Sequence, residues 1–176
     1  MVHMSKVILM ANIKNVKMEI PNSILRILKQ NHWNKFNFEL MKQNYLDKLK
    51  HNYSKYDYPM TSALLEKITI FYNIRLKFAS QELFFDIKKI NKYRQAFLNL
   101  QAAKFGVKKI VYLGDIHPGY ITIWLDEQEQ VWGDYDDIIY LYGRGLFNGI
   151  ENILTGNFTI KSLSLIHISE PTRRSY

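Results

Sequence analysis

The hydrophobic periodicity of the chain changes near residue 109, and this change constrains the fold more than any other feature. Upstream, apolar residues recur at helical spacing in four segments, which begin near Pro21, Phe38, Pro59 and Ile90. Downstream, short β-branched and aromatic runs alternate with turn sequences such as GDIHPG at 114–119. Helices followed by an antiparallel meander are typical of an α+β fold and not of alternating βαβ units.

The downstream part is predicted to contain four short strands. These strands are expected at residues 109–113, 120–125, 131–134 and 138–142. A further strand is expected upstream at 74–78, and residues 84–85 are expected to form a loop before the fourth helix, which Gly106 should end. A short closing helix is predicted from about Leu146 to near Gly156.

One domain is expected over residues 21–163. Residues 1–20 alternate weakly and are interpreted as an N-terminal extension or an edge strand. Residues 164–176 lose the Asn, Lys, Tyr and Ile bias of the rest and resemble a translated sequencing adaptor, so we predict a non-native tail there. Because no apolar run approaches the ~20 residues of a membrane helix and no secretory signal is recognisable, we expect a cytoplasmic protein with no membrane partner. The sequence does not indicate an oligomeric state.

Charge is distributed unevenly along the chain. Residues 1–109 contain 20 basic and 7 acidic residues, a net charge of +13, whereas residues 110–151 contain 1 basic and 8 acidic residues, a net charge of −7. The formal charge of +8 for the whole chain therefore hides an acidic segment inside a basic protein. A partner could be attracted to either region, so the total alone does not predict nucleic-acid binding.

The residue types exclude several kinds of site. The chain has no cysteine, which excludes a thiolate nucleophile, a disulfide framework and every cysteine-ligated metal centre. The histidines lack metal-ligand spacing, and neither a nucleophile elbow nor a serine triad is recognisable. We therefore expect no enzymatic activity, no metal and no cofactor.

Three patterns have a functional and a structural interpretation. The glycines at 143, 145 and 149 follow a predicted strand and open a helix, as a phosphate loop does, but the third glycine comes one residue late and little chain follows. We therefore favour a tight turn.

The basic N-terminal region interleaves lysines with aromatic residues, as a nucleic-acid groove does. Most of these aromatics fall on apolar helical stripes, which favours a solvated lysine surface. The residues of that pattern are Trp33, Lys35, Phe36, Phe38, Lys48, Lys50, Tyr53, Lys55 and Tyr56.

The third pattern is an acidic group in the hairpin region. Its members are Asp115, Asp126, Glu127, Glu129, Asp134, Asp136 and Asp137. The order of residues differs from that of a calcium loop, and the spacing does not indicate a catalytic carboxylate pair. Solvated hairpin ends are the favoured interpretation, and a protein-binding face is the main alternative.

The order of motifs resembles the SUKH superfamily of bacterial immunity proteins, most closely its third family. His32-Trp33 stands where the family has Gly-Trp, and Tyr58-Pro59 matches a Tyr-Pro before a helix. The best match is the closing region, YLGDIHPGYITIWLDEQEQVWGDYDDIIYLYGRGLFNGIENILTG, and the resemblance covers about residues 21–156. The chain departs from the family pattern at three glycine positions, where it has His32, Tyr72-Asn73-Ile74 (near a Gly-Gly-Leu) and Glu129. Altered turns are expected there.

The resemblance implies a twisted antiparallel sheet packed by helices and a protein that neutralises a toxin domain by binding and occluding it, without catalysis. Charge complementarity and aromatic anchors would suit such an inhibitor, and a basic substrate cleft of a nuclease or deaminase toxin would meet the acidic segment. The candidate toxin-binding residues are Trp124, Asp126, Glu127, Glu129, Trp132, Asp134, Tyr135, Asp136 and Asp137. The alternative function is a nucleic-acid-binding module that uses the basic N-terminal region, and nucleic acid is the less expected partner.

Overall fold

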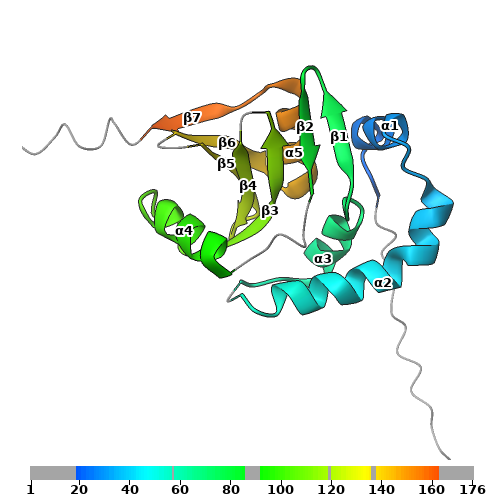
Figure 1. Cartoon of the computed structure of the whole chain (residues 1–176), viewed down its shortest axis with the longest axis horizontal. Coiled ribbons are helices and arrows are strands. Elements are labelled where there is room, and N and C mark those ends of the chain that lie inside the picture. Colours follow the sequence, from blue (N-terminus) through cyan, green and yellow to red (C-terminus); the bar gives the residue numbers. More distant parts are fainter. Residues whose placement is uncertain (1–18, 57, 86–91, 119, 136–137, 163–176) are drawn as a thin grey trace, which may run out of the picture.

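The computed structural model describes residues 19–56, 58–85, 92–118, 120–135 and 138–162, which form helices around one twisted antiparallel sheet (Figure 1). The helices are α1 (Asn22–Gln30), α2 (Lys35–Tyr53), α3 (Ser62–Thr69), α4 (Lys92–Ala103) and α5 (Leu146–Thr155). The strands are β1 (Arg75–Phe78), β2 (Gln81–Phe84), β3 (Ile110–His117), β4 (Ile121–Asp126), β5 (Gln130–Tyr135), β6 (Ile138–Arg144) and β7 (Thr159–Ser162).

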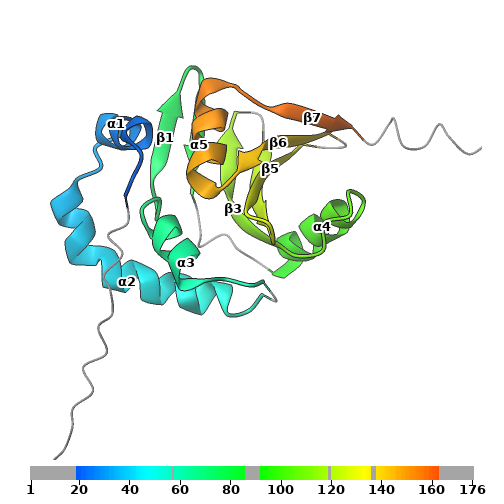
Figure 2. The ribbon, with the colours of Figure 1, turned by 180° about the vertical axis from the view of Figure 1, so that it is seen from behind.

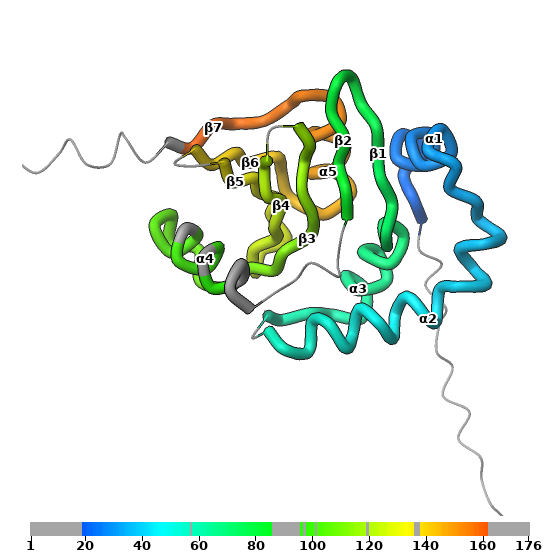
Figure 3. The backbone as a smooth tube through the Cα atoms, in the orientation of Figure 1, coloured from blue at the N-terminus to red at the C-terminus, as the bar shows by residue number. Residues whose placement is uncertain are grey.

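The seven strands follow one another across the sheet in chain order, and every neighbouring pair is antiparallel. Figure 3 traces this meander, which is interrupted by α4 between β2 and β3 and by α5 between β6 and β7. The predicted α+β class, with helices first and an antiparallel sheet later, is confirmed.

The structure corrects the prediction at two strands. Phe84 belongs to β2 and pairs with Arg75 and Asp115 on its two neighbouring strands, so residues 84–85 are not simply a loop. The helix expected to close the domain is followed by β7, which pairs with β6. Both strands have only four residues, and their sequences, QELF and TIKS, alternate too briefly to give a period-two signal.

Both faces of the sheet are covered by helices. Alternate residues such as Val111, Ile123 and Val131 pack in the main core with α1, α2, α3 and α5. The residues between them, including Tyr112 and Trp124, form a second core with α4. Figure 2 shows α5 lying across one face of the sheet, with α4 beside the strands on a different side of the molecule from α2 and α3.

Local capping explains where the helices begin and end. The Thr61 hydroxyl accepts a hydrogen bond from the Leu64 backbone N–H at 3.1 Å, so α3 begins after Thr61 and not at Pro59, as the sequence pattern had indicated. Asn34 caps α2 in the same way through the N–H of Asn37. Gly156 ends α5 in a left-handed conformation, with φ of 71°.

In the part of the chain that the structure describes, no helix combines the length and the apolar character that crossing a membrane requires. The predictions for residues 1–18 and 164–176 lie outside the described residues, as do Asp136 and Asp137.

Candidate functional site

Trp124 and Trp132 lie inside the second core and not on the surface. They pair across β4 and β5, and their rings stack at a centroid distance of 5.4 Å and an interplanar angle of 13°. Residues of α4 and its C-terminal connection, including Leu98, Ala102 and Phe105, pack in the same cluster. The expectation that these two tryptophans anchor a partner is therefore corrected: both are buried and stabilise the fold.

The Asp126 carboxylate is also buried, and it organises the turn between β4 and β5. It accepts hydrogen bonds from the backbone N–H groups of Gln128 (2.9 Å) and Gln130 (2.8 Å). The Gln130 side-chain amide and the Trp132 indole N–H donate to its second oxygen at 2.8 and 2.9 Å. With four donors inside one hairpin, Asp126 is a structural residue and not a partner contact.

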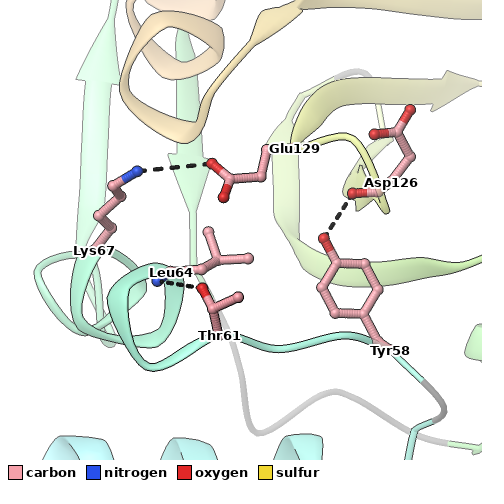
Figure 4. A network of polar contacts seen from close by, with 6 residues as sticks. All are labelled: Tyr58, Thr61, Leu64, Lys67, Asp126 and Glu129. Carbon is pink, nitrogen blue, oxygen red and sulfur yellow. Dashed lines mark hydrogen bonds and ion pairs between the residues drawn. The ribbon is translucent and has the colours of Figure 1, made fainter.

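The same hairpin is tied to the helical layer below it (Figure 4). The Tyr58 hydroxyl donates to the backbone oxygen of Asp126 at 2.6 Å, and Lys67 Nζ lies 3.7 Å from the Glu129 carboxylate. Burial, followed by the nearby carboxylates of Asp126, Glu129 and Glu127, raises the pKa of Tyr58 well above its usual value. Tyr58 therefore remains a neutral donor at physiological pH.

Glu127 and Glu129 are more accessible than Asp126 but also have contacts within the chain. The Glu127 carboxylate accepts a hydrogen bond from the Lys109 backbone N–H at 3.0 Å. Although slight burial opposes it, hydrogen bonding from backbone N–H groups, including that of Lys109, lowers the pKa of Glu127. The ion pair with Lys67 offsets the charge of Glu129.

The predicted acidic face is not one surface. Asp126, Glu127 and Glu129 lie where β5 begins, whereas Tyr135 lies where it ends, five residues later, at about 3.3 Å per residue. Asp134 and Asp115 are buried in the sheet, and Asp115 accepts a hydrogen bond from the Tyr112 hydroxyl at 2.7 Å. The acidic residues that the structure describes are therefore divided between the β4–β5 turn and the interior of the sheet.

An exposed apolar surface does occur at the end of the sheet where Tyr135 lies. Tyr135 pairs directly with Ile138, and both side chains are exposed. Tyr120 precedes β4 at the same end, because Thr122 pairs with Asp134, and its side chain is 76% exposed. We call Tyr120, Tyr135 and Ile138 the sheet-end surface. Of these, only Tyr135 was expected from the sequence. Tyr120 and Ile138 could have been found from their places beside predicted turns.

Gly143 and Gly145 form the tight strand-to-helix turn that the sequence favoured, whereas Gly149 lies within α5. Gly143 and Gly145 have φ of 144° and 83°, conformations that L side chains rarely adopt. Gly149 faces β5, and a Cβ atom there would overlap the side chain of Val131. Close packing of α5 on the sheet therefore accounts for Gly149.

The basic N-terminal region offers few exposed aromatic rings. Phe38 and Tyr53 are buried in the main core and Trp33 is half-buried, whereas Lys48 and Lys50 are exposed. This arrangement matches a solvated lysine surface over an aromatic core.

A hollow of about 690 Å³ lies between the α1–α2 connection and β1, with Arg75 and Lys77 in its lining. Arg75 already lies 3.3 Å from the Glu82 carboxylate and stacks over the Phe84 ring. The charge of Arg75 is thus partly offset within the chain, which makes this residue less available to a phosphate backbone.

Three non-glycine residues have a left-handed backbone at or near the positions where the family pattern has glycine. The φ angles are 64° at His32, 57° at Asn73 and 58° at Glu129. Such a conformation costs a non-glycine residue about 1–2 kcal/mol, and somewhat less for asparagine. The side chains differ from the pattern, but the backbone takes the conformation that glycine favours.

Within the described residues, no three histidine, aspartate or glutamate side chains come together as metal ligands. Comparisons with protein-family models, curated proteins and solved structures found no match to this chain.

Proposed function

We propose that this chain is a SUKH-like immunity protein, which binds a bacterial toxin domain and neutralises it by covering the toxin's functional surface. The observation that carries the proposal is the left-handed backbone at His32, Asn73 and Glu129. All three lie at or near glycines of the family pattern, so the backbone at these positions is compatible with that pattern although the side chains differ. The order of helices and antiparallel strands agrees with this assignment.

The sheet-end surface is the best candidate for the toxin contact. It places Tyr135 and Ile138, which pair on neighbouring strands, at the same end of the sheet as Tyr120, which precedes β4. Tyrosine is enriched among the residues that dominate binding energy at interfaces. In sequence, Asp136 and Asp137 join Tyr135 to Ile138, which favours a partner with a basic surface, such as a nuclease or deaminase domain. Occlusion of the toxin's substrate site then requires no catalytic activity of this chain.

The proposal is tested with the toxin domain encoded by the adjacent gene. The purified domain should form a stable complex with this chain, measured by isothermal titration calorimetry. Alanine at Tyr120, Tyr135 and Ile138 together should weaken binding at least about 100-fold, because truncation of central anchors commonly costs 2 kcal/mol or more each. A matched triple substitution of Phe36, Leu40 and Leu100, which are exposed on α2 and α4, should leave the affinity within about threefold.

An adjacent gene for replication or regulation, with no toxin domain, would argue against the proposal. Unchanged binding of the sheet-end variant would exclude this surface but not the immunity role.

A further inference from the structure

The two edges of the sheet are protected differently. At the β1 edge, the Lys77 backbone N–H donates to the Asn31 side-chain oxygen at 3.1 Å, so a residue of the α1–α2 connection caps an edge group. At the other edge, β7 pairs with β6 on one side, and no element of the described chain pairs with its outer side. An edge strand of this kind presents backbone donors and acceptors to another strand.

The side chains beside the β7 edge are apolar and exposed. Ile160 is 58% exposed and lies opposite Tyr140 on β6. Phe158, which directly precedes β7, is also exposed and packs edge-on against Tyr140 at a centroid distance of 5.2 Å. These residues form a short apolar strip on the α5 side of the sheet, at the outer edge. The one charged residue of β7 is Lys161. Its side chain lies on the opposite face of the sheet, because Lys161 pairs with Ile139.

The strip is complementary to itself. Consider two β7 strands that pair antiparallel about a two-fold axis perpendicular to the sheet. Residues directly opposite each other in an antiparallel pair point to the same face of the sheet. The axis must therefore lie between the two copies of one residue. An axis at Lys161 would bring two ammonium groups opposite each other, which is unfavourable. An axis at Ile160 instead places Ile160 opposite Ile160 and each Lys161 opposite Thr159 of the other copy. An axis at Thr159 would place Ile160 opposite Phe158, which lies outside β7, and would pair only Thr159 within the strand. The axis at Ile160 is therefore the one that brings the apolar residues together, separates the cations and pairs three residues of each β7.

We propose that β7 pairs antiparallel with β7 of a second copy of this chain, about a two-fold axis at Ile160, so that the two sheets become continuous. The pairing adds backbone hydrogen bonds and buries Ile160 and Phe158 of both copies. A four-residue edge buries less than the 1,200–2,000 Å² of a standard interface, so the dimer is weak and depends on concentration. This inference does not depend on the proposed function.

The register is tested by cysteine crosslinking. Because the chain has no natural cysteine, any disulfide must form through the introduced one. In the proposed dimer the two Cα atoms at position 160 lie about 4.5–5.5 Å apart, within reach of a disulfide. The full-length Ile160→Cys variant should therefore form a disulfide-linked dimer under mild oxidation. Lys161→Cys is the matched control: it is exposed on the same strand, but its two copies are diagonal neighbours about 7–8 Å apart. It should crosslink at least tenfold more slowly.

Sedimentation equilibrium of the cysteine-free chain provides the second test. The wild type should show a mass that rises reversibly from monomer to dimer with concentration. Ile160→Asp should lower the association constant about tenfold or more, because it places two carboxylates opposite each other. Leu100→Asp, the same change at a residue 65% exposed on α4, should not.

A monomeric mass at every concentration, or equal crosslinking of the two cysteine variants, would overturn the proposal. A chain that is monomeric alone but loses toxin binding on Ile160→Asp would overturn it too, and would assign the edge to a strand of the toxin.

Discussion

The indole N–H of Trp132 donates to the Asp126 carboxylate at 2.9 Å, inside a hairpin whose turn the same carboxylate holds together. From the sequence we expected Trp132 to anchor a binding partner and Asp126 to make a charged contact with it. The two side chains are instead hydrogen-bonded to each other. Their effect on any partner is indirect, through the stability of the β4–β5 hairpin.

Removal of the Asp126 carboxylate should destabilise the protein. Asp126→Ala leaves the buried indole N–H of Trp132 and the turn N–H groups without their acceptor, which should cost about 2–4 kcal/mol of unfolding free energy. Urea unfolding followed by tryptophan fluorescence measures this loss. Glu127→Ala, in the same turn, should cost less than about 1 kcal/mol because its carboxylate is exposed. Equal losses would show that Asp126 does not organise the turn.

The left-handed backbone at Glu129 should reverse the usual order of alanine and glycine. With φ of 58° there, Glu129→Gly should be more stable than Glu129→Ala by about 1 kcal/mol, since both variants lose the contact with Lys67 equally. At Glu127, where φ is not positive, alanine should be as stable as glycine or more so. Thermal unfolding of the four variants provides the comparison, and a more stable alanine at position 129 would contradict the assigned backbone.

Gly149 should not tolerate even a methyl group. Gly149→Ala forces a Cβ atom into the space held by the Val131 side chain, and we expect a loss of about 1–3 kcal/mol. Val131→Ala should partly restore the stability of Gly149→Ala, although it is destabilising in the wild type. Simple additivity of the two losses in a double-mutant cycle would show that α5 does not pack on β5 at this point.

Alkaline pH should destabilise the fold through its buried tyrosines. Burial, followed by the neighbouring Tyr56 and Tyr58, raises the pKa of Tyr53 far above its usual value. An unfolded tyrosine ionises near pH 10, so above that pH the folded state retains a proton that the unfolded state loses. Stability contributed in this way is present below pH 10 and is lost as pH rises, by up to about 1.4 kcal/mol per pH unit for this group.

The Tyr53→Phe variant tests this origin. It should flatten the dependence of unfolding free energy on pH above 10, at a cost of about 1 kcal/mol near neutrality from the lost hydrogen bond to the Tyr112 backbone oxygen. An identical slope for Tyr53→Phe and wild type would assign the alkaline effect to other groups.

The sequence predicted most of the elements because long periodic segments carry their own signal. The four downstream strands and the helix after Gly145 follow from alternation and turn residues. β1 has the same length, but it continues a longer β-branched and aromatic run that indicates a strand. β2 and β7 stand alone as four-residue segments, which give at most two alternations, and they form by pairing with β3 and β6.

The candidate surface was harder to predict because both faces of this sheet are buried. The alternation along the strands correctly places Trp124 and Trp132 on the face of the sheet opposite the main core. That face is not exposed, however, because α4 covers it. Alternation indicates which residues share a face and does not indicate whether that face meets water. The charge of the acidic segment likewise gave no sign that Asp126 is enclosed by its own turn.

The most direct test of the proposed toxin-neutralising role is growth of a bacterial host that expresses a toxin domain encoded by the gene adjacent to that of this chain. Co-expression of the wild-type chain should restore growth to the level of an inactive-toxin control. The sheet-end triple variant should not restore it, although the variant accumulates to the same level. Continued toxicity in the presence of abundant, folded wild-type chain would contradict the account.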